Sequence, residues 1–479
     1  MVVVQGSKVP LPNPSSLSSS PHPHTSILFE PSSLSLALTH TDASLSLYPS
    51  FSPLSLTPSQ PHTQTLNIPS PSSSSTFLLL QQHPSAATAV IFLVSSPYRS
   101  RILLRFYRLC RRDHSSFERV TRVLCLHKDL CFHPGLGVLL DAKHGAAVRL
   151  AASVNYFTLY SLSSNKVWVF AVKDDDGSGN DCSNSNDDDD SGSASGSGGV
   201  RLMRRAVIDC ARPVFSLSVA FGFLILGEEN GVRVFGLRRL VKGKGGNKRF
   251  GNSKQLRNGG GVRGGGLEVV NCNGDLEGKM ERRRVLAVKQ INVKSKHDDR
   301  DGGSCFVMLK GNNVNTNSAT EVSMSIKAIS IQAVSQRMFL ILDSHGDLHL
   351  LSLSNSGIGV DVTGNVRQLP RTMKVKSVAV LPDLSSMSQT IWISDGCHSV
   401  HMFTAMDIEN ALNETDGNDS NEKLLRLPVV RVLFSSEKIQ DIISLSANSV
   451  LILGQDMLHH LDTLRKNTSF FKHQVLKLI

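Results

Sequence analysis

The sequence predicts an all-β fold built from a repeated hairpin, and three observations support this prediction. Apolar residues occur in short runs that alternate with polar residues, with almost no helical period. A 13-residue unit recurs five times without gaps. The 479 residues are 40% hydrophobic, which is enough for a large core. Together these features indicate hairpins that stack to bury their apolar faces.

The repeated unit has the same internal plan in every copy. An apolar run of about four residues, which is strand length, leads into a polar turn, and two apolar residues two positions apart follow it. Each unit ends on a bulky residue that we expect in the core: Tyr48, Phe170, Phe235, Leu351 and Phe403. The copies are 36–48 (LALTHTDASLSLY), 158–170 (TLYSLSSNKVWVF), 223–235 (FLILGEENGVRVF), 339–351 (FLILDSHGDLHLL) and 391–403 (IWISDGCHSVHMF).

The turns of these units carry residues that accept unusual backbone angles. They are Asp42, Asn165, Asn230, Gly231, Gly346, Asp395 and Gly396. In the strand after the turn, a period of two places Val232 and Val234 on one face. A lone hairpin is at best marginally stable in water, so the units must pack on one another.

The spacing of the units predicts their number. A sixth, shorter copy lies at 450–461, and the two long gaps between copies each have room for one more unit. We expect one hairpin from 88–94 with 101–109, and a degenerate one from 285–293 with 305–309. The total is seven or eight units, each slightly longer than the ~40–45 residues of a typical propeller blade.

The unit resembles the central hairpin of a WD-repeat blade, whose second strand ends in an aromatic residue at this spacing. The resemblance implies a single closed β-propeller of about seven blades over residues 26–479, acting as a protein-interaction platform. The chain departs from the family pattern because the Trp-Asp pair is absent: Gly236 follows Phe235, and Thr404 follows Phe403. A different all-β repeat or two β-sandwich domains are the alternative architectures.

Low-complexity segments interrupt this pattern. Residues 1–25 are rich in Ser and Pro, and we expect a disordered N-terminus. Insertions near 174–199, 242–266, 297–319 and 410–421 are too polar to fold alone, so we expect them to be surface loops of the scaffold. The Ser-rich start is also compatible with a plastid transit peptide, but the absence of Arg from the first 98 residues argues against it.

The basic insertion is the candidate contact site that the sequence offers. The net charge is +11, and one group of cations is spaced by Gly and Asn: Lys242, Lys244, Lys248, Arg249, Lys254, Arg257 and Arg263. Flexible cations of this kind neutralise phosphates without reading sequence. RNA contact, nuclear import and an inert loop are the three interpretations.

No motif for catalysis, metal or cofactor binding is apparent. The sequence has no GxSxG elbow, HExxH pair or P-loop. His398 and His401 alternate along a predicted strand and face apart, which disfavours a shared metal. The Asp run at 187–190 has carboxylates for Ca²⁺ but lacks EF-hand spacing, so an acidic loop is the preferred interpretation. We therefore expect no enzyme activity, no metal and no cofactor.

Cysteine and hydropathy patterns indicate the compartment. The eight cysteines make no CxxC pair and no disulfide spacing, which favours a reducing compartment, nuclear or cytoplasmic. No apolar stretch approaches the ~20 residues of a membrane span. Arg101, Arg105, Arg108 and Arg112 would line one face of a helix, but the surrounding pattern favours a strand. The sequence thus predicts a non-catalytic scaffold with protein partners, and an RNA-associated factor is the alternative.

Overall fold

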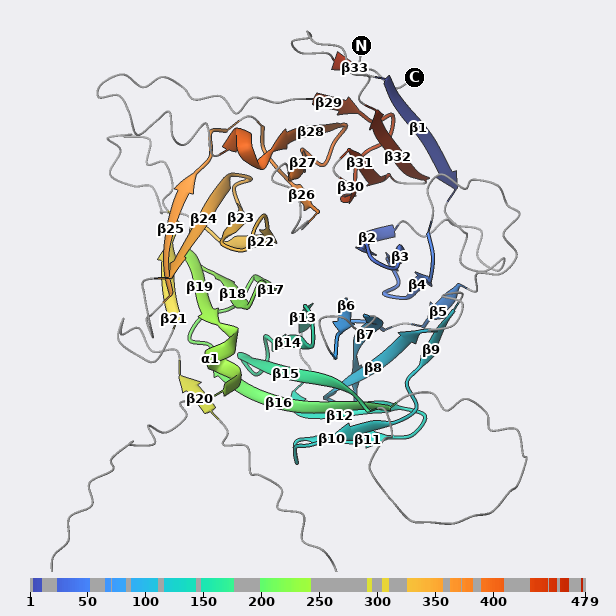
Figure 1. The fold of residues 1–479 in the computed structure, drawn as a ribbon, viewed down its shortest axis with the longest axis vertical. Coiled ribbons are helices and arrows are strands. Elements are labelled where there is room, and N and C mark those ends of the chain that lie inside the picture. The colour runs from blue at the N-terminus through green and yellow to red at the C-terminus, as the bar shows by residue number, and fades with distance from the viewer. Residues whose placement is uncertain are drawn as a thin grey trace, which may run out of the picture.

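The computed structural model describes a ring of seven β-sheets, which we call blades 1 to 7 (Figure 1). The residues it describes are 3–10, 24–51, 65–69, 71–82, 88–110, 116–143, 148–175, 199–242, 291–294, 304–309, 325–355, 362–371, 373–381, 389–408, 431–446, 448–454, 457–464 and 475–476. In this part of the chain almost every element is a strand. The predicted all-β class is therefore confirmed.

Blades 1, 4 and 5 are plain four-stranded sheets. Blade 1 contains β2 (His24–Glu30), β3 (Ser35–His40), β4 (Leu45–Tyr48) and β5 (Leu66–Ile68). Blade 4 contains β17 (Ser216–Ala220), β18 (Phe223–Glu228), β19 (Gly231–Gly236) and β21 (Ser304–Met308), with helix α1 (Leu237–Lys242) after β19. Blade 5 contains β22 (Ala328–Ala333), β23 (Met338–Asp343), β24 (Leu348–Asn355) and β25 (Val362–Gln368).

Blades 6 and 7 bring the chain ends into sheets. Blade 6 contains β26 (Ser377–Val380), β27 (Thr390–Ser394), β28 (Ser399–Thr404), β29 (Arg431–Phe434) and the short β33 (Val475–Leu476). Blade 7 contains β30 (Asp441–Ser446), β31 (Ser449–Leu453) and β32 (Met457–Leu464). Its fourth strand is the N-terminal β1 (Val3–Pro10).

Blades 2 and 3 are larger than the others. Blade 2 contains β6 (Ser74–Leu80), β7 (Ala89–Tyr98) and β8 (Arg101–Leu109), flanked by β9 (Phe117–Arg119), β11 (Leu130–His133) and β12 (Gly137–Lys143). Blade 3 contains β13 (Val148–Ala152), β14 (Tyr156–Ser161), β15 (Lys166–Asp175) and β16 (Gly199–Asp209). Two strands, β10 (Val123–Cys125) and β20 (Ile291–Lys294), pair in parallel with β16.

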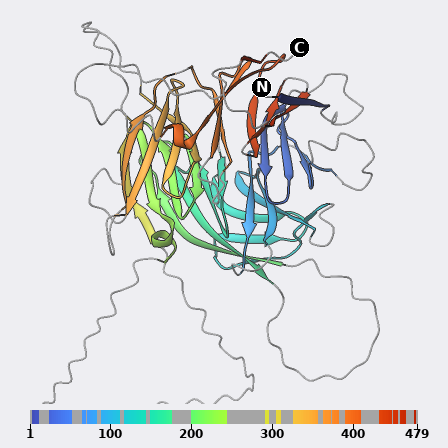
Figure 2. The same cartoon turned by 45° about the horizontal axis from the view of Figure 1, so that its top comes forward.

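The first strands of the seven blades form a closed ring. Each first strand contacts the next one in the order β2, β6, β13, β17, β22, β26 and β30, and β30 contacts β2. Figure 2 shows the strands of successive blades standing side by side around this ring. The architecture is a single closed propeller, so the prediction of about seven blades is confirmed for the described residues.

The repeated units are the central hairpins of the blades. All six copies pair as antiparallel hairpins: β3–β4, β14–β15, β18–β19, β23–β24, β27–β28 and β31–β32. The seventh hairpin is β7–β8, so the Arg101 segment is a strand, as expected. Four of the terminal bulky residues, Phe170, Phe235, Leu351 and Phe403, are at most 2% exposed, while Tyr48 is half-buried.

The core lies between the blades, because alternate residues of a strand face opposite neighbours. In β27, Ile391 and Ile393 pack into the cluster shared with blade 5. The intervening Trp392 packs into the cluster shared with blade 7 and is fully buried. The period of two in the sequence therefore reports burial on both faces of the sheet.

Two predictions about the insertions are wrong. Val3–Pro10, expected to be disordered, form β1 and pair with β32 over eight residues. Residues 304–308, expected in a polar insertion, form β21 on the outer edge of β19 rather than a hairpin with 285–293. Both are edge strands whose partners are remote in sequence, so a local pattern does not reveal them. Most of 242–266 and all of 410–421 lie outside the described residues, and Asp174, Asp175 and Gly199 belong to β15 and β16.

Asp441 bridges the seam where blade 7 meets blade 1. Its carboxylate accepts hydrogen bonds from the backbone N–H of Ile442 at 2.9 Å and of Ile27, in β2, at 3.2 Å. Burial raises the pKa of Asp441 to about 6, and the two N–H donors only partly oppose this. β2 of blade 1 thus hydrogen-bonds to the carboxyl group of the first residue of β30 in blade 7.

The raised pKa of Asp441 predicts that its contribution to the free energy of unfolding falls as the pH rises. The native pKa of about 6 exceeds the ordinary value of 3.8, so the folded state holds the proton more tightly than the unfolded state. The contribution of Asp441 to stability is greatest below pH 4, falls between pH 4 and pH 6, and changes by up to about 3 kcal/mol. Urea unfolding at pH 4 and pH 7 measures the change. Asp441→Asn should lose it, and an equal slope in both proteins would contradict the assignment.

Candidate interaction face

One face of the ring is formed by the turns between the second and third strands of the blades. Because every blade is entered along its first strand in the same direction, these turns share a face with the connections between blades. We call this surface the turn face. Its turns are 41–44, 99–100, 162–165, 229–230, 344–347 and 395–398.

In five blades the turn is hydrogen-bonded to the connection that leaves the same blade. The turn carbonyls accept from backbone N–H groups at 2.8 to 3.0 Å: Ala43 from Ser72, Asn165 from Cys210, Asn230 from Leu309, Gly346 from Val375, and Cys397 from Ile439. The turn residues Ala43, Asn165, Asn230, Gly346 and Gly396 have φ between 47° and 83°. Left-handed geometry turns these backbones toward the connection, and Gly or Asn tolerates it best.

Aspartates cap the turns of blades 1, 5 and 6. In blade 6, Asp395 accepts from the backbone N–H of Cys397 at 2.8 Å and from the N–H and hydroxyl of Ser399 at 3.2 and 2.8 Å. Burial alone would raise the pKa of Asp395, but these hydrogen bonds outweigh it and lower the pKa. The carboxylate therefore stays charged and holds the turn in one conformation.

Blade 5 has a stronger version of this cap. Asp343 accepts from the backbone N–H groups of His345 and Asp347 at 2.8 and 2.9 Å, and from Nε2 of His349 at 2.8 Å. Asp343 is 2% exposed and His349 is fully buried. Burial opposes ionisation of Asp343, yet the hydrogen bonds, with that from His349 the largest, lower its pKa.

This polar pair is not among the residues that the sequence pattern predicts as a site. Asp343 and His349 occupy the fifth and eleventh positions of the repeated unit, and in blade 1 the same positions hold His40 and Ser46, whose side chains hydrogen-bond at 2.8 Å. Polar residues that recur at two fixed positions of an otherwise apolar unit are the signal that could have revealed it. The pair joins neighbouring strands of one hairpin.

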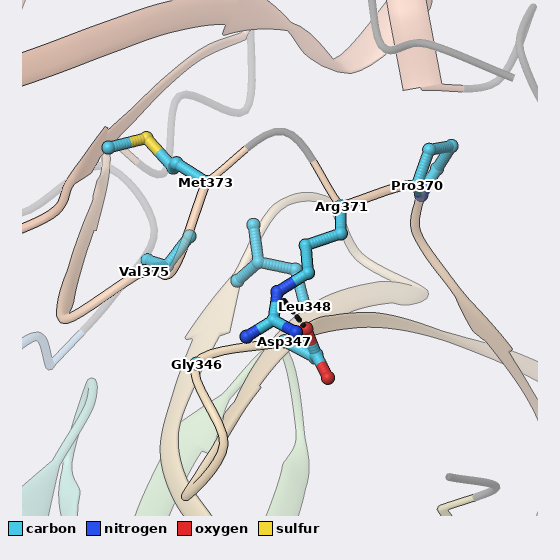
Figure 3. Close-up of a pocket in the computed structure, with 7 residues that line it drawn as sticks. All are labelled: Gly346, Asp347, Leu348, Pro370, Arg371, Met373 and Val375. Atoms are coloured by element: carbon cyan, nitrogen blue, oxygen red, sulfur yellow. Dashed lines mark ion pairs between the residues drawn. The ribbon is translucent and has the colours of Figure 1, made fainter. Parts of the chain in front are cut away.

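A small hollow opens on the turn face beside blade 5 (Figure 3). Its walls are the turn at Gly346–Leu348 and the connection from Pro370 to Val375. Arg371 reaches across it, with Nε 3.2 Å from the Asp347 carboxylate. The hollow has room for about one water molecule. A hollow of this size is too small for a small-molecule ligand.

Two lysines of the turn face lie across glycine turns. A Cβ on Gly346 would be 2.7 Å from Cγ of Lys374 and 2.9 Å from the carbonyl oxygen of Val375. A Cβ on Gly396 would be 2.6 Å from Cδ of Lys376. Glycine at these turns therefore lets the lysine stems pack against the backbone. Both lysines are exposed, so their stems are positioned while their ammonium groups face solvent.

The predicted site residues are not brought together by the described structure. Lys242 ends α1, and Lys244, Lys248, Arg249, Lys254, Arg257 and Arg263 lie outside the described residues. His398 is exposed beside the turn of blade 6, whereas His401 is half-buried and burial lowers its pKa. In the described segments, no three His, Cys, Asp or Glu residues are grouped to hold a metal ion.

The inner strands offer few groups for acid–base chemistry. β6, β13, β17, β22 and β26 contain no Asp, Glu, His, Cys or Lys. On β2, Glu30 accepts hydrogen bonds from the hydroxyl groups of Ser32 and Ser33. Asp441 on β30 accepts from the backbone N–H groups of Ile27 and Ile442, as described above. Both carboxylates are thus engaged in hydrogen bonds within the fold.

Blade topology and ring closure decide the fold family. Antiparallel four-stranded blades surround a ring, and an N-terminal strand completes the last blade. The chain is a β-propeller similar to WD-repeat proteins. Phe170, Phe235, Leu351 and Phe403 fill the blade cores at the aromatic end position of that repeat. No family model and no curated protein matches the sequence.

Solved structures resemble this WD-repeat-like propeller at low sequence identity. The structure of U3-55K is 9% identical, with coverage of 93% of this chain and 97% of that chain and a TM-score of 0.41. The WD40 repeats of RRP9 are also 9% identical, with coverage of 94% and 96% and a TM-score of 0.41. A chain in the structure of Chaetomium thermophilum Polycomb Repressive Complex 2 bound to GSK126 is 6% identical, with coverage of 96% of this chain and 98% of that chain and a TM-score of 0.48.

Proposed function

We propose that this propeller is a non-catalytic scaffold that holds partner proteins on its turn face. The observation that carries the proposal is that five turns are pinned to the connections between blades, so the surface is preorganised. A preorganised surface binds with a smaller entropy cost than mobile loops do. Lys374 and Lys376 add positioned charges, which increase the specificity and the rate of association.

The propeller is proposed to work in a reducing compartment, nuclear or cytoplasmic. The six described cysteines, Cys110, Cys125, Cys131, Cys210, Cys305 and Cys397, are free thiols. In the part of the chain with described structure, no helix is both long and apolar enough to cross a membrane. RNA contact through the basic insertion stays a prediction from the sequence.

Charge reversal on the turn face tests the scaffold proposal. The tagged protein is purified from its native cells after RNase treatment. Lys374→Glu with Lys376→Glu should lower the recovered amount of a subset of partners at least tenfold. Arg337→Glu is the control, because Arg337 is an exposed cation at the opposite end of blade 5. Mass spectrometry reads the result. An unchanged partner set in the double variant would contradict the proposal, and partners lost on RNase treatment alone would favour RNA.

A further inference from the structure

Blade 3 carries a sheet extension that the propeller ring does not require. β15 and β16 are 10 and 11 residues long, and their paired ends run past the blade to meet β10. Figure 1 shows β10, β11 and β12 on the outer side of these strands. In the extension, three strands of the blade 3 sheet pair in the order β10, β16, β15.

The residues of this extension form a regular grid on one sheet face. Register places Lys173 opposite Arg201, and Arg201 beside Leu124. Two residues further along lie Ala171, Met203 and Leu126, and two residues the other way lie Asp175, Gly199 and Arg122. Leu126 and Arg122 flank β10 and continue its pairing with β16 through backbone hydrogen bonds. Residues two apart on a strand share a face. We call these nine residues the blade 3 outer face.

The two faces of the extension differ in burial. On the inner face Val172, Val200 and Leu202 are fully buried in the cluster between blades 2 and 3. On the outer face Leu124 is 41% exposed and Leu126 is 49% exposed. Among the described residues, this is the one place where two exposed large apolar side chains lie two residues apart in the sequence. An apolar patch bordered by polar groups is typical of an interaction surface.

Cations border this apolar patch. Lys173 and Arg201 lie in the same row of the grid as Leu124. Arg122 lies two residues before Leu124, and its side chain is 73% exposed. The face already holds one carboxylate: Asp175 lies 2.9 Å from Nη2 of Arg201 and 3.9 Å from Nη2 of Arg122. Three cations against one carboxylate leave a positive surplus around an apolar centre.

We propose that the blade 3 outer face docks an acidic, amphipathic segment of a partner protein. Apolar side chains of the partner cover Leu124, Leu126 and Met203, while its carboxylates meet Lys173, Arg122 and Arg201. A second copy of this chain would bring like charges together, which is destabilising. A nucleic-acid backbone would leave the leucines against phosphate. The inference rests on the scaffold function but concerns a surface separate from the turn face.

Site-specific photo-crosslinking in the full chain tests the proposal. A photoreactive residue in place of Leu126 is expected to crosslink to another protein through a segment rich in Asp or Glu and apolar residues. Crosslinks only to residues 176–198 or 243–290 of this chain, to a second copy, to basic segments or to RNA would overturn it, as would the absence of crosslinks.

Charge variants make the test specific. In the crosslinking protein, Arg201→Glu with Lys173→Glu should lower the crosslink yield at least tenfold, and 0.5 M NaCl should lower it as well. The control is Arg149→Glu, an exposed arginine on the inner strand of the same blade. An unchanged urea midpoint shows that each variant is folded. A crosslink yield in the Arg201→Glu, Lys173→Glu variant equal to that of the control would overturn the proposal. If the turn-face variants lose their partners while the Leu126 crosslink is unchanged, the two surfaces act separately.

Discussion

Replacing Asp343 with alanine is expected to lower the free energy of unfolding by about 3–5 kcal/mol. The substitution leaves the fully buried His349 without its carboxylate and releases the N–H groups of His345 and Asp347. Removing one partner of a buried polar pair costs more than the pair itself contributes, because the other partner stays desolvated. Blade 5 should therefore be the least stable blade in this variant.

Asp42→Ala is the matched control for this substitution. Asp42 caps the equivalent turn of blade 1 by accepting from the N–H and hydroxyl of Ser44, but it is exposed. Its loss should cost less than about 1 kcal/mol, as surface substitutions do. Urea unfolding followed by fluorescence of the buried Trp168 and Trp392 measures both variants. Equal shifts of the two midpoints would show that the Asp343 pair is not a special contact.

The Asp343 contribution has a defined pH range. Its native pKa is below the ordinary value of 3.8, so the folded state favours the charged form. The stabilisation is present above pH 4 and is lost as the pH falls through the native pKa. The difference in stability between the native protein and Asp343→Asn should be constant at neutral pH and shrink below pH 4. This direction is opposite to that expected for Asp441.

Deleting residues 2–10 is expected to destabilise the propeller by about 5 kcal/mol. β1 pairs with β32 over eight residues, and each backbone hydrogen bond contributes on the order of 1 kcal/mol. The deletion leaves the outer edge of β32 unpaired, and an open strand edge promotes association. We therefore expect both a lower urea midpoint and dimers or larger species in size-exclusion chromatography.

A second deletion of the same length separates this effect from simple shortening. Removing residues 182–190 takes nine residues from the Ser-, Asn- and Asp-rich insertion and none from a described strand. Its midpoint should match that of the intact protein. A synthetic peptide of residues 1–12 should restore the midpoint of the shortened protein when added in excess. If deletion of 2–10 had no effect on the midpoint, the N-terminus would be a dispensable tail, as its composition suggests.

The local pattern of the sequence was sufficient for the central hairpins. Phe339–Leu351 and its equivalents alternate because each strand of a blade is buried on both sides, and their turns contain residues such as Gly346 that accept a positive φ. Four of the five predicted core residues are buried for the same reason. These are interactions between residues close in sequence, so composition and spacing carry the information.

The candidate surfaces required the tertiary structure. The turn face arises because ring closure aligns turns that are more than 50 residues apart, and its lysines are set by contacts with Gly346 and Gly396. The blade 3 outer face combines β10, β15 and β16, whose register no local pattern encodes.

The sequence by itself determined that this chain is a β-repeat protein, that its hairpins number about seven, and which residues fill them. Only the tertiary structure decided that β1 completes blade 7, that β21 and β10 are edge strands, and that Asp343 is buried against His349. The division has a physical cause. Hairpin formation depends on local backbone angles and alternation, whereas edge pairing and surface composition depend on which remote segments the closed ring brings together.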